Sequence, residues 1–243
     1  VRRLVGSEMC IRDSNYTSSF NGTSAAAPTV AGVVALMLSA NNELDYRGIK
    51  HLLAGTSQVV DADRRVTLGG VDLHSWVTNA AGFNFHNWYG FGKVDADLAV
   101  AAAAIFDQAL LGTQSTQERL AEFTTPVQIP NAEGRSASIN LTAGAGTLGI
   151  VEFIRLKIKF SASQAVALND IGITLTSPSG TTHSVLQPFT NVSGQPSFYW
   201  AIGVAGFYGE TVEGDWEVTI FDYSDDAISP GTWDGFELEV HYR

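Results

Sequence analysis

The chain has 243 residues, of which 45% are hydrophobic, so it can build one large domain or two of ordinary size around a real core. Its 25 acidic and 14 basic residues give a formal net charge of −11, and its lysines and arginines are not clustered. This composition excludes a mainly disordered chain and argues against nucleic acid as a partner, because phosphate binding relies on clustered basic side chains.

Residues 1–14 (VRRLVGSEMCIRDS) differ in character from the rest of the chain. They lack the apolar stretch and small-residue cleavage site of a signal peptide, and they look like translated adaptor sequence; an ordinary N-terminal arm is the alternative. We expect them to be foreign, which would leave the chain truncated at its N-terminus. Cys10 is the only cysteine, so the remainder would hold no disulfide, as in many exported enzymes.

Helical patterns dominate up to about residue 111. Ala25–Ala40 is small and apolar on every face, which predicts a helix buried all round. A second, amphipathic helix is predicted over Tyr46–Leu53, preceded by Asn41, Asn42 and Asp45, which offer turn and cap chemistry. A third is predicted over Val94–Leu111, with Asp95 near its start. The chain has no run of about 18 uninterrupted apolar residues, so we predict no membrane span.

Alternation with a period of two follows from about residue 123. The alternating segments are 154–160, 171–175, 216–220 and 236–242, separated by turns such as Ser177–Gly180. Strict alternation predicts antiparallel strands with one buried face, and several such strands predict a sandwich or jelly roll. We therefore divide the chain into residues 15–111, a linker over 112–122 that begins with Gly112–Gln117, and a β-domain over 123–243.

The string Gly22–Pro28 (GTSAAAP) stands at the entrance to the first predicted helix and presents Ser24 there. A serine in the first helical turn has an N–H without an intrahelical partner, and the positive end of the helix dipole can stabilise an oxyanion. Gly22 lets a substrate approach the backbone closely, and Pro28 is expected to lie early enough in the helix to cost little. The pattern indicates a nucleophile rather than a small-residue helix start.

Two other serine chemistries fit less well. A nucleophile elbow needs glycine two residues after the serine, where Ala26 stands. A Ser-x-x-Lys pair needs lysine where Ala27 stands.

GTSAAAP followed by an apolar helix resembles the nucleophile motif of the subtilisin-like serine proteases (peptidase S8). Residues 40–51, 76–82 and 86–96 resemble the end of the catalytic domain in the kexin and furin branch, and residues 169–181, 213–222 and 231–240 resemble its P domain (P/Homo B). The resemblance implies an α/β fold: the C-terminal part of a parallel-sheet domain, mostly helical here, followed by an all-β jelly-roll or sandwich P domain.

By this resemblance the chain is part of a secreted serine endopeptidase that acts on proteins or peptides through an acyl-enzyme on Ser24. The family's histidine base and orienting aspartate precede the serine. Among the 23 residues before Ser24 there is no histidine, Asp13 is the only aspartate, and Asn15 and Asn21 are too close to serve as the oxyanion-hole asparagine. We therefore expect the chain as given to be inactive.

The histidines after Ser24 are interpreted as structural. His51, His74 and His86 stand in the wrong order for this family, and His86 belongs to a motif that needs only a turn and a packed aromatic. His183 and His241 are predicted at the surface or at a strand edge of the sandwich.

An acidic turn contains Asp222, Asp225 and Asp226. It could ligate Ca²⁺ through its oxygens or be a solvated loop, since its spacing matches no EF-hand. No cofactor is expected for the chemistry itself, although the resemblance allows for structural Ca²⁺.

A second functional hypothesis concerns the sandwich alone. It would act as a stabilising or binding module without catalysis, and the resemblance implies that it packs against the protease part within the molecule. Substrate preference, including a preference for paired basic residues, does not follow from this sequence.

Overall fold

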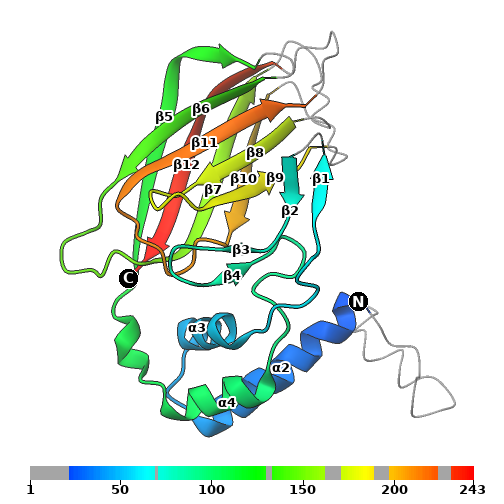
Figure 1. Ribbon diagram of the computed structural model, residues 1–243. Helices are drawn as coiled ribbons and strands as arrows, with labels where there is room; N and C mark the ends of the chain where they lie inside the picture. Colours follow the sequence, from blue (N-terminus) through cyan, green and yellow to red (C-terminus); the bar gives the residue numbers. More distant parts are fainter. Residues whose placement is uncertain (1–21, 69–70, 130–132, 162–170, 189–196, 224–230) are drawn as a thin grey trace, which may run out of the picture.

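The computed structural model describes residues 22–68, 71–129, 133–161, 171–188, 197–223 and 231–243. A group of helices lies at one end of a β-sandwich, one short hairpin lies between the helices and the sandwich, and a second lies beside the sandwich (Figure 1). The stretch 1–14, predicted as foreign, falls outside the described residues.

The helices are α2 (Thr23–Ala40), α3 (Tyr46–Thr56), α4 (Ala96–Ile105) and the 3₁₀-helix η1 (Gln108–Leu111). Local capping fixes two of the starts, as predicted. The Asp45 carboxylate accepts from the N–H groups of Arg47 and Gly48 at 2.8 and 3.0 Å, and Asp95 accepts from Leu98 N–H at 3.0 Å. These side chains satisfy donors that the first helical turn leaves unpaired.

The third helix is shorter than the predicted range of 94–111. The side-chain amide of Asn41 donates to the carbonyls of Ala103 and Phe106 at 3.0 and 2.9 Å, which satisfies acceptors at the end of α4. Asp107 then caps η1 by accepting from Ala109 N–H. Asn41 follows α2 directly, so this contact also ties the end of α2 to the end of α4.

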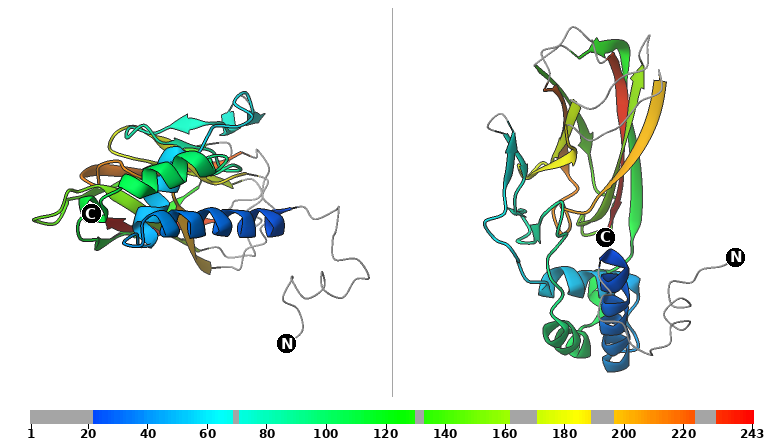
Figure 2. Two further views of the ribbon diagram at one scale, coloured as in Figure 1. Left: turned by 90° about the horizontal axis from the view of Figure 1, so that it is seen from below. Right: turned by 90° about the vertical axis from the view of Figure 1, so that its right-hand side faces the viewer.

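The prediction that the first helix is buried all round is wrong. Only Val33 and Met37 of α2 are buried, where they share an apolar cluster with Ala99 and Ala103 of α4. Leu36, on another face, is 57% exposed. The helix packs along α4 on one side, and most of its remaining surface is exposed among the described residues (Figure 2).

By length and composition alone, α2 is also long and apolar enough to cross a membrane. The sequence criterion of an uninterrupted apolar run missed this because Thr29 and Ser39 interrupt the run. In the structure the C-terminal half of the helix packs on α4.

Two hairpins connect α3 to α4. They are formed by β1 (Val66–Leu68) with β2 (Val71–His74) and by β3 (Val77–Thr78) with β4 (Asn84–Phe85). Every strand pair in the described part of the chain is antiparallel. The parallel sheet implied by the family resemblance is therefore not found among these residues.

The sandwich consists of two four-stranded antiparallel sheets with strand orders β10-β7-β12-β5 and β6-β11-β8-β9. Figure 2 shows the two sheets facing each other. The strands are β5 (Ser115–Gln128), β6 (Gly134–Leu141), β7 (Val151–Ser161), β8 (Ile171–Thr176), β9 (Thr182–Leu186), β10 (Ser197–Val204), β11 (Gly214–Asp222) and β12 (Thr232–Tyr242).

The core of the sandwich lies between the sheets and confirms the predicted alternation. In β7 the four apolar residues at alternate positions, Ile154 to Phe160, are all buried, and Trp216 and Trp233 lie fully inside. The predicted turn at Ser177–Gly180 is also present, with Gly180 N–H donating to Ser177 O at 2.9 Å. A two-sheet sandwich is thus observed, while a jelly-roll connection order stays a prediction.

The first strand of the sandwich begins earlier than expected. Strand β5 starts at Ser115 and pairs with β12 over Ser115–Glu122 and again at Val127 and Gln128, so residues 115–122, predicted as linker, form a strand. As an edge strand, β5 carries exposed side chains such as Glu118 and Leu120, which weakens the apolar alternation that reveals a strand. The division of the chain into domains remains a prediction.

Candidate active site

Ser24 is the second residue of α2, and its side chain is exposed. The helix begins at Thr23, with Gly22 at the N-cap in a left-handed conformation (φ +85°) that favours glycine. The string GTSAAAP therefore forms the start of a helix, as predicted, and the serine hydroxyl is open to solvent at its mouth.

The backbone donors at this mouth are not capped by a side chain. Gly22 O accepts from the N–H groups of Ala25 and Ala26 at 3.0 and 3.3 Å, and none of the described residues accepts from Thr23 or Ser24 N–H. The first turn carries no acidic side chain to offset the helix dipole. A negative charge placed beside Ser24 would therefore find free N–H donors and a favourable dipole.

Pro28 lies deeper in the helix than expected. It is the sixth helical residue, and the N–H that it lacks would have bonded to the carbonyl of Ser24 in a regular helix. The prediction that this proline costs little is therefore wrong. The Thr29 hydroxyl donates to Ala25 O at 3.0 Å just beyond it.

The N-terminal half of α2, residues 23–32, contains no buried residue although it is largely apolar. Beside the helix lies an apolar hollow of about 510 Å³, lined among others by Val34 of α2, Ile49 and Leu53 of α3, and Val94. Both the N-terminal half of α2 and the hollow beside Val34 thus leave apolar surface uncovered among the described residues.

In the described part of the chain, no histidine or carboxylate bonds to Ser24. His86 is 1% exposed, and its Nδ1 accepts from Trp88 N–H at 3.0 Å. His74 Nδ1 lies 2.6 Å from the amide nitrogen of Gln187. Burial lowers the pKa of both imidazoles, which matches a packed, neutral role rather than that of a base for Ser24.

The two histidines of the sandwich differ from each other. His241 lies on β12 near the surface, where Nε2 is 2.8 Å from Glu239. His183 is on the edge strand β9 as predicted, but it is buried between Phe85 and Phe207, so its prediction as a surface residue is wrong. A segment from the other part of the chain covers this edge, which the sequence of the strand does not reveal.

The acidic turn is described only in part. Asp222 is the last residue of β11 and is buried, so it does not belong to a solvated loop. Asp225 and Asp226 lie outside the described residues. Within the described ranges no group of three or more histidine, cysteine, aspartate or glutamate side chains is placed to hold a metal ion.

A buried ion pair joins the helical part to the sandwich. Arg47 of α3 binds Glu152 of β7 through two nitrogens, with Nε 2.9 Å from Oε2 and Nη2 2.6 Å from Oε1. Their side chains are only 10% and 4% exposed. The hydrogen bond to Glu152 raises the pKa of Arg47, and the guanidinium also donates to the carbonyls of Leu111 and Gly112.

A second connection holds the turn between β3 and β4. The Asn79 amide nitrogen donates to Gly206 O and Tyr208 O, both at 2.9 Å, while its oxygen accepts from two N–H groups of its own turn. Ala80 N–H donates to buried Glu210 at 2.9 Å. These contacts show that the two parts pack against each other within the molecule.

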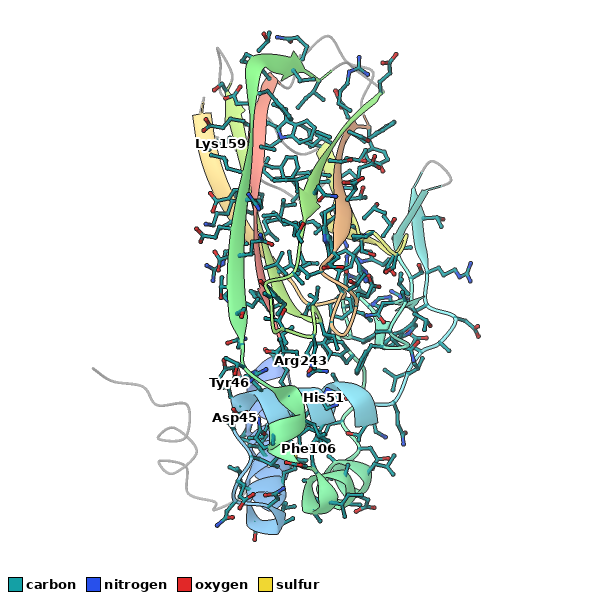
Figure 3. The ribbon with its side chains drawn as sticks, turned by 90° about the vertical axis from the view of Figure 1, so that its left-hand side faces the viewer. Asp45, Tyr46, His51, Phe106, Lys159 and Arg243 are labelled. Atoms are coloured by element: carbon teal, nitrogen blue, oxygen red, sulfur yellow. The ribbon has the colours of Figure 1, made fainter. Side chains whose placement is uncertain are left out.

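The third connection is an aromatic cluster around His51, which Figure 3 shows at the junction close to Arg243. His51 Nδ1 lies 3.0 Å from the Tyr208 hydroxyl, and its ring packs near Phe83 and Phe106. Sequence patterns alone do not identify these junction residues. Arg47 and Glu152 are 105 positions apart, and a basic residue on an amphipathic helix is ordinarily solvated.

Two family models match the chain. Residues 10–92 match the subtilase family, and residues 152–240 match the proprotein convertase P-domain. The first match contains Ser24 and the α2 motif, and it begins inside the stretch predicted as foreign.

Among curated proteins, proprotein convertase subtilisin/kexin type 5 of Rattus norvegicus is 29% identical over 214 residues, covering 85% of this chain and 11% of its own length. The Aeromonas extracellular serine protease of Aeromonas sobria is 29% identical over 244 residues, covering 90% of this chain and 38% of its own. The chain thus spans well under half of these relatives.

A solved structure shares the fold. The crystal structure of the serine protease of Aeromonas sobria matches with a TM-score of 0.80 at 23% identity, covering 94% of this chain and 45% of that one. The helical part and the sandwich are thus arranged as in that serine protease.

Proposed function

We propose that this chain, which joins a segment of the subtilase family to a proprotein convertase P domain, is part of a serine endopeptidase whose nucleophile is Ser24. The observation that carries the proposal is the exposed hydroxyl of Ser24 at an uncapped helix N-terminus inside the subtilase match. Proteins or peptides are the proposed substrates, and secretion is proposed because the Aeromonas sobria relative is by name extracellular.

In the proposed reaction, Ser24 Oγ attacks the scissile carbonyl carbon and loses its proton to a general base. The oxygen of that carbonyl becomes an oxyanion, which free N–H groups at the helix mouth would stabilise. The peptide C–N bond then breaks, the amine leaves with a proton, and water hydrolyses the acyl-enzyme. This chemistry needs no cofactor.

The base and its orienting acid come from residues other than those described. We accordingly expect the 243 residues alone to be inactive. The uncovered apolar half of α2 supports this view, because a helix so apolar is stable when other elements bury it. We propose that the rest of the peptidase domain covers this half and the adjoining hollow.

A longer protein that contains this chain and hydrolyses peptides would test the assignment. A serine-directed phosphonate is expected to label Ser24, and Ser24→Ala should lower kcat by about three orders of magnitude or more. Ser39→Ala is the matched control, since Ser39 is exposed at the other end of the same helix. Equal hydrolysis by Ser24→Ala and its parent would refute the proposal.

Structural Ca²⁺, which the resemblance allows, finds no group of three or more histidine, cysteine, aspartate or glutamate side chains among the described residues.

The sandwich has a second proposed role as a stabilising module. The specific support is its set of buried polar contacts with the helical part, in particular Arg47–Glu152 and the Asn79 amide. Adding the separately produced sandwich to the helical part should then raise the melting temperature of the latter. If the helical part melts at the same temperature with and without the added sandwich, the stabilising role is contradicted.

A further inference from the structure

The contact between His51 and Tyr208 joins a half-buried imidazole to a buried phenol. Tyr208 is 2% exposed, and burial raises the pKa of its phenol, so the hydroxyl keeps its proton. The phenol can donate to Nδ1 of a neutral His51 across the 3.0 Å between the two atoms, and its oxygen can also accept from Nδ1 when that nitrogen carries a proton. This hydrogen bond links α3 to the loop between β10 and β11.

Among the residues that the structure describes, positively charged side chains outnumber carboxylates around this contact. Arg243 directly follows β12, and its positive charge opposes protonation of His51 and favours ionisation of Tyr208. Lys50 lies 5.3 Å from the centre of the Tyr208 ring, and Arg47 is on the same helix. Glu152 is the carboxylate that acts on His51, while Phe83 and Phe106, from the remaining elements, add only apolar rings.

The carboxylate of Glu152 already accepts hydrogen bonds from other side chains. Both oxygens of Glu152 accept from Arg47, and Oε2 also accepts from Gln114 at 2.9 Å. Arg243 Nη1 is 3.8 Å from Glu152 Oε1, and its Nε and Nη1 have no hydrogen-bond partner among the described residues. An additional positive charge at His51 would face a buried guanidinium whose own charge is poorly compensated.

We propose that His51, Tyr208 and Arg243 form an acid-sensitive contact that holds the helical part to the sandwich while His51 is neutral and loosens it when His51 is protonated. Protonation would add a positive charge to a half-buried ring that packs near Phe83 and Phe106 and faces the positively charged Arg243. This contact lies at the junction and does not depend on the role of Ser24.

The pH range follows from the direction of the shift. Burial and then the charge of Arg243 lower the pKa of His51 below its ordinary value of about 6.5. The separated state therefore takes up the proton first as the pH falls. The contact is at full strength above about pH 6.5 and weakens progressively below it, until the pKa of the joined state is reached.

Hydrogen exchange of the whole 243-residue chain at pH 7.5 and pH 5.5, corrected for intrinsic rates, tests the proposal. We expect α3 and residues 205–213 to exchange roughly threefold faster or more at the lower pH. The variant His51→Gln should remove this difference, because its amide oxygen accepts from Tyr208 and does not titrate. Equal protection of the wild-type chain at both pH values would overturn the proposal.

Matched variants separate this histidine from the others. His241→Gln changes an imidazole on β12 that bonds Glu239 rather than Tyr208, so the acid-induced difference should persist. Arg243→Gln should raise the pKa of His51, and NMR titration of the imidazole would measure the change. A wild-type His51 that titrates at or above about 6.5, measured in the same way, would overturn the proposal without any variant.

Discussion

At the scale of single residues, local sequence indicates the proposed role of Ser24 but does not indicate the ion pair that Arg47 forms. Ser24 is identified by six adjacent neighbours and by the helix that they start, so its exposure at the helix mouth follows from local sequence. Arg47 looks like any basic residue on an amphipathic helix. Its role depends on Glu152, which lies 105 positions away and becomes its partner only after both parts have folded.

Arg47→Met should destabilise the chain by about 3–5 kcal/mol, because it leaves the Glu152 carboxylate buried without its main partner. Urea unfolding followed by circular dichroism would measure the loss.

Arg135→Met is the control for this change. Arg135 pairs with Glu133 at 3.2 Å, but both side chains are well exposed, so the cost should be about 0–1 kcal/mol. Similar losses for the two variants would show that the Arg47 ion pair is solvated in solution.

At the scale of elements, the starts of helices could be predicted and their burial could not. Asp45 and Asp95 cap α3 and α4 through contacts within three residues, which sequence patterns record directly. The burial of α2 depends on what packs against it, and an apolar composition alone suggested cover on every side. The first half of strand β5 was not predicted for a related reason. An edge strand with exposed polar residues lacks a clear alternation of apolar and polar side chains.

Asp45→Ala should cost about 0.5–2 kcal/mol in unfolding free energy, because Arg47 and Gly48 N–H lose their acceptor. Gln108 also loses its partner, since its side-chain amide donates to Asp45 at 2.9 Å.

Asp45→Asn retains an acceptor oxygen and should recover most of that stability, as measured by thermal unfolding. If alanine and asparagine behave alike at this position, the cap does not fix the start of α3.

At the scale of the whole molecule, the sequence predicts a helical part followed by a two-sheet sandwich, because each part has its own period. It does not predict how the parts meet. The junction uses Asn79, His51 and Tyr208, whose side chains look ordinary in isolation and gain partners from segments more than a hundred residues apart. The burial of His183 on its edge strand was not predicted for the same reason.

A sandwich produced by itself should therefore begin at Ser115 and not at Phe123. Eight residue pairs join Ser115–Glu122 to β12, and each is worth roughly 0.2–1 kcal/mol, so residues 123–243 should be less stable than 115–243 by roughly 2 kcal/mol or more. Chemical unfolding of both would measure this. Equal stability would mean that the first half of β5 contributes nothing.

The order of the strands has a consequence for synthesis of the protein. Strand β12 is the last in sequence but lies inside its sheet, between β7 and β5. Until residues 232–242 emerge from the ribosome, β5 and β7 lack their shared partner strand, and the edges that β12 will occupy stay unpaired. The nascent sandwich is thus exposed to aggregation until its final strand is released, and a premature stop codon before that strand would leave it permanently open.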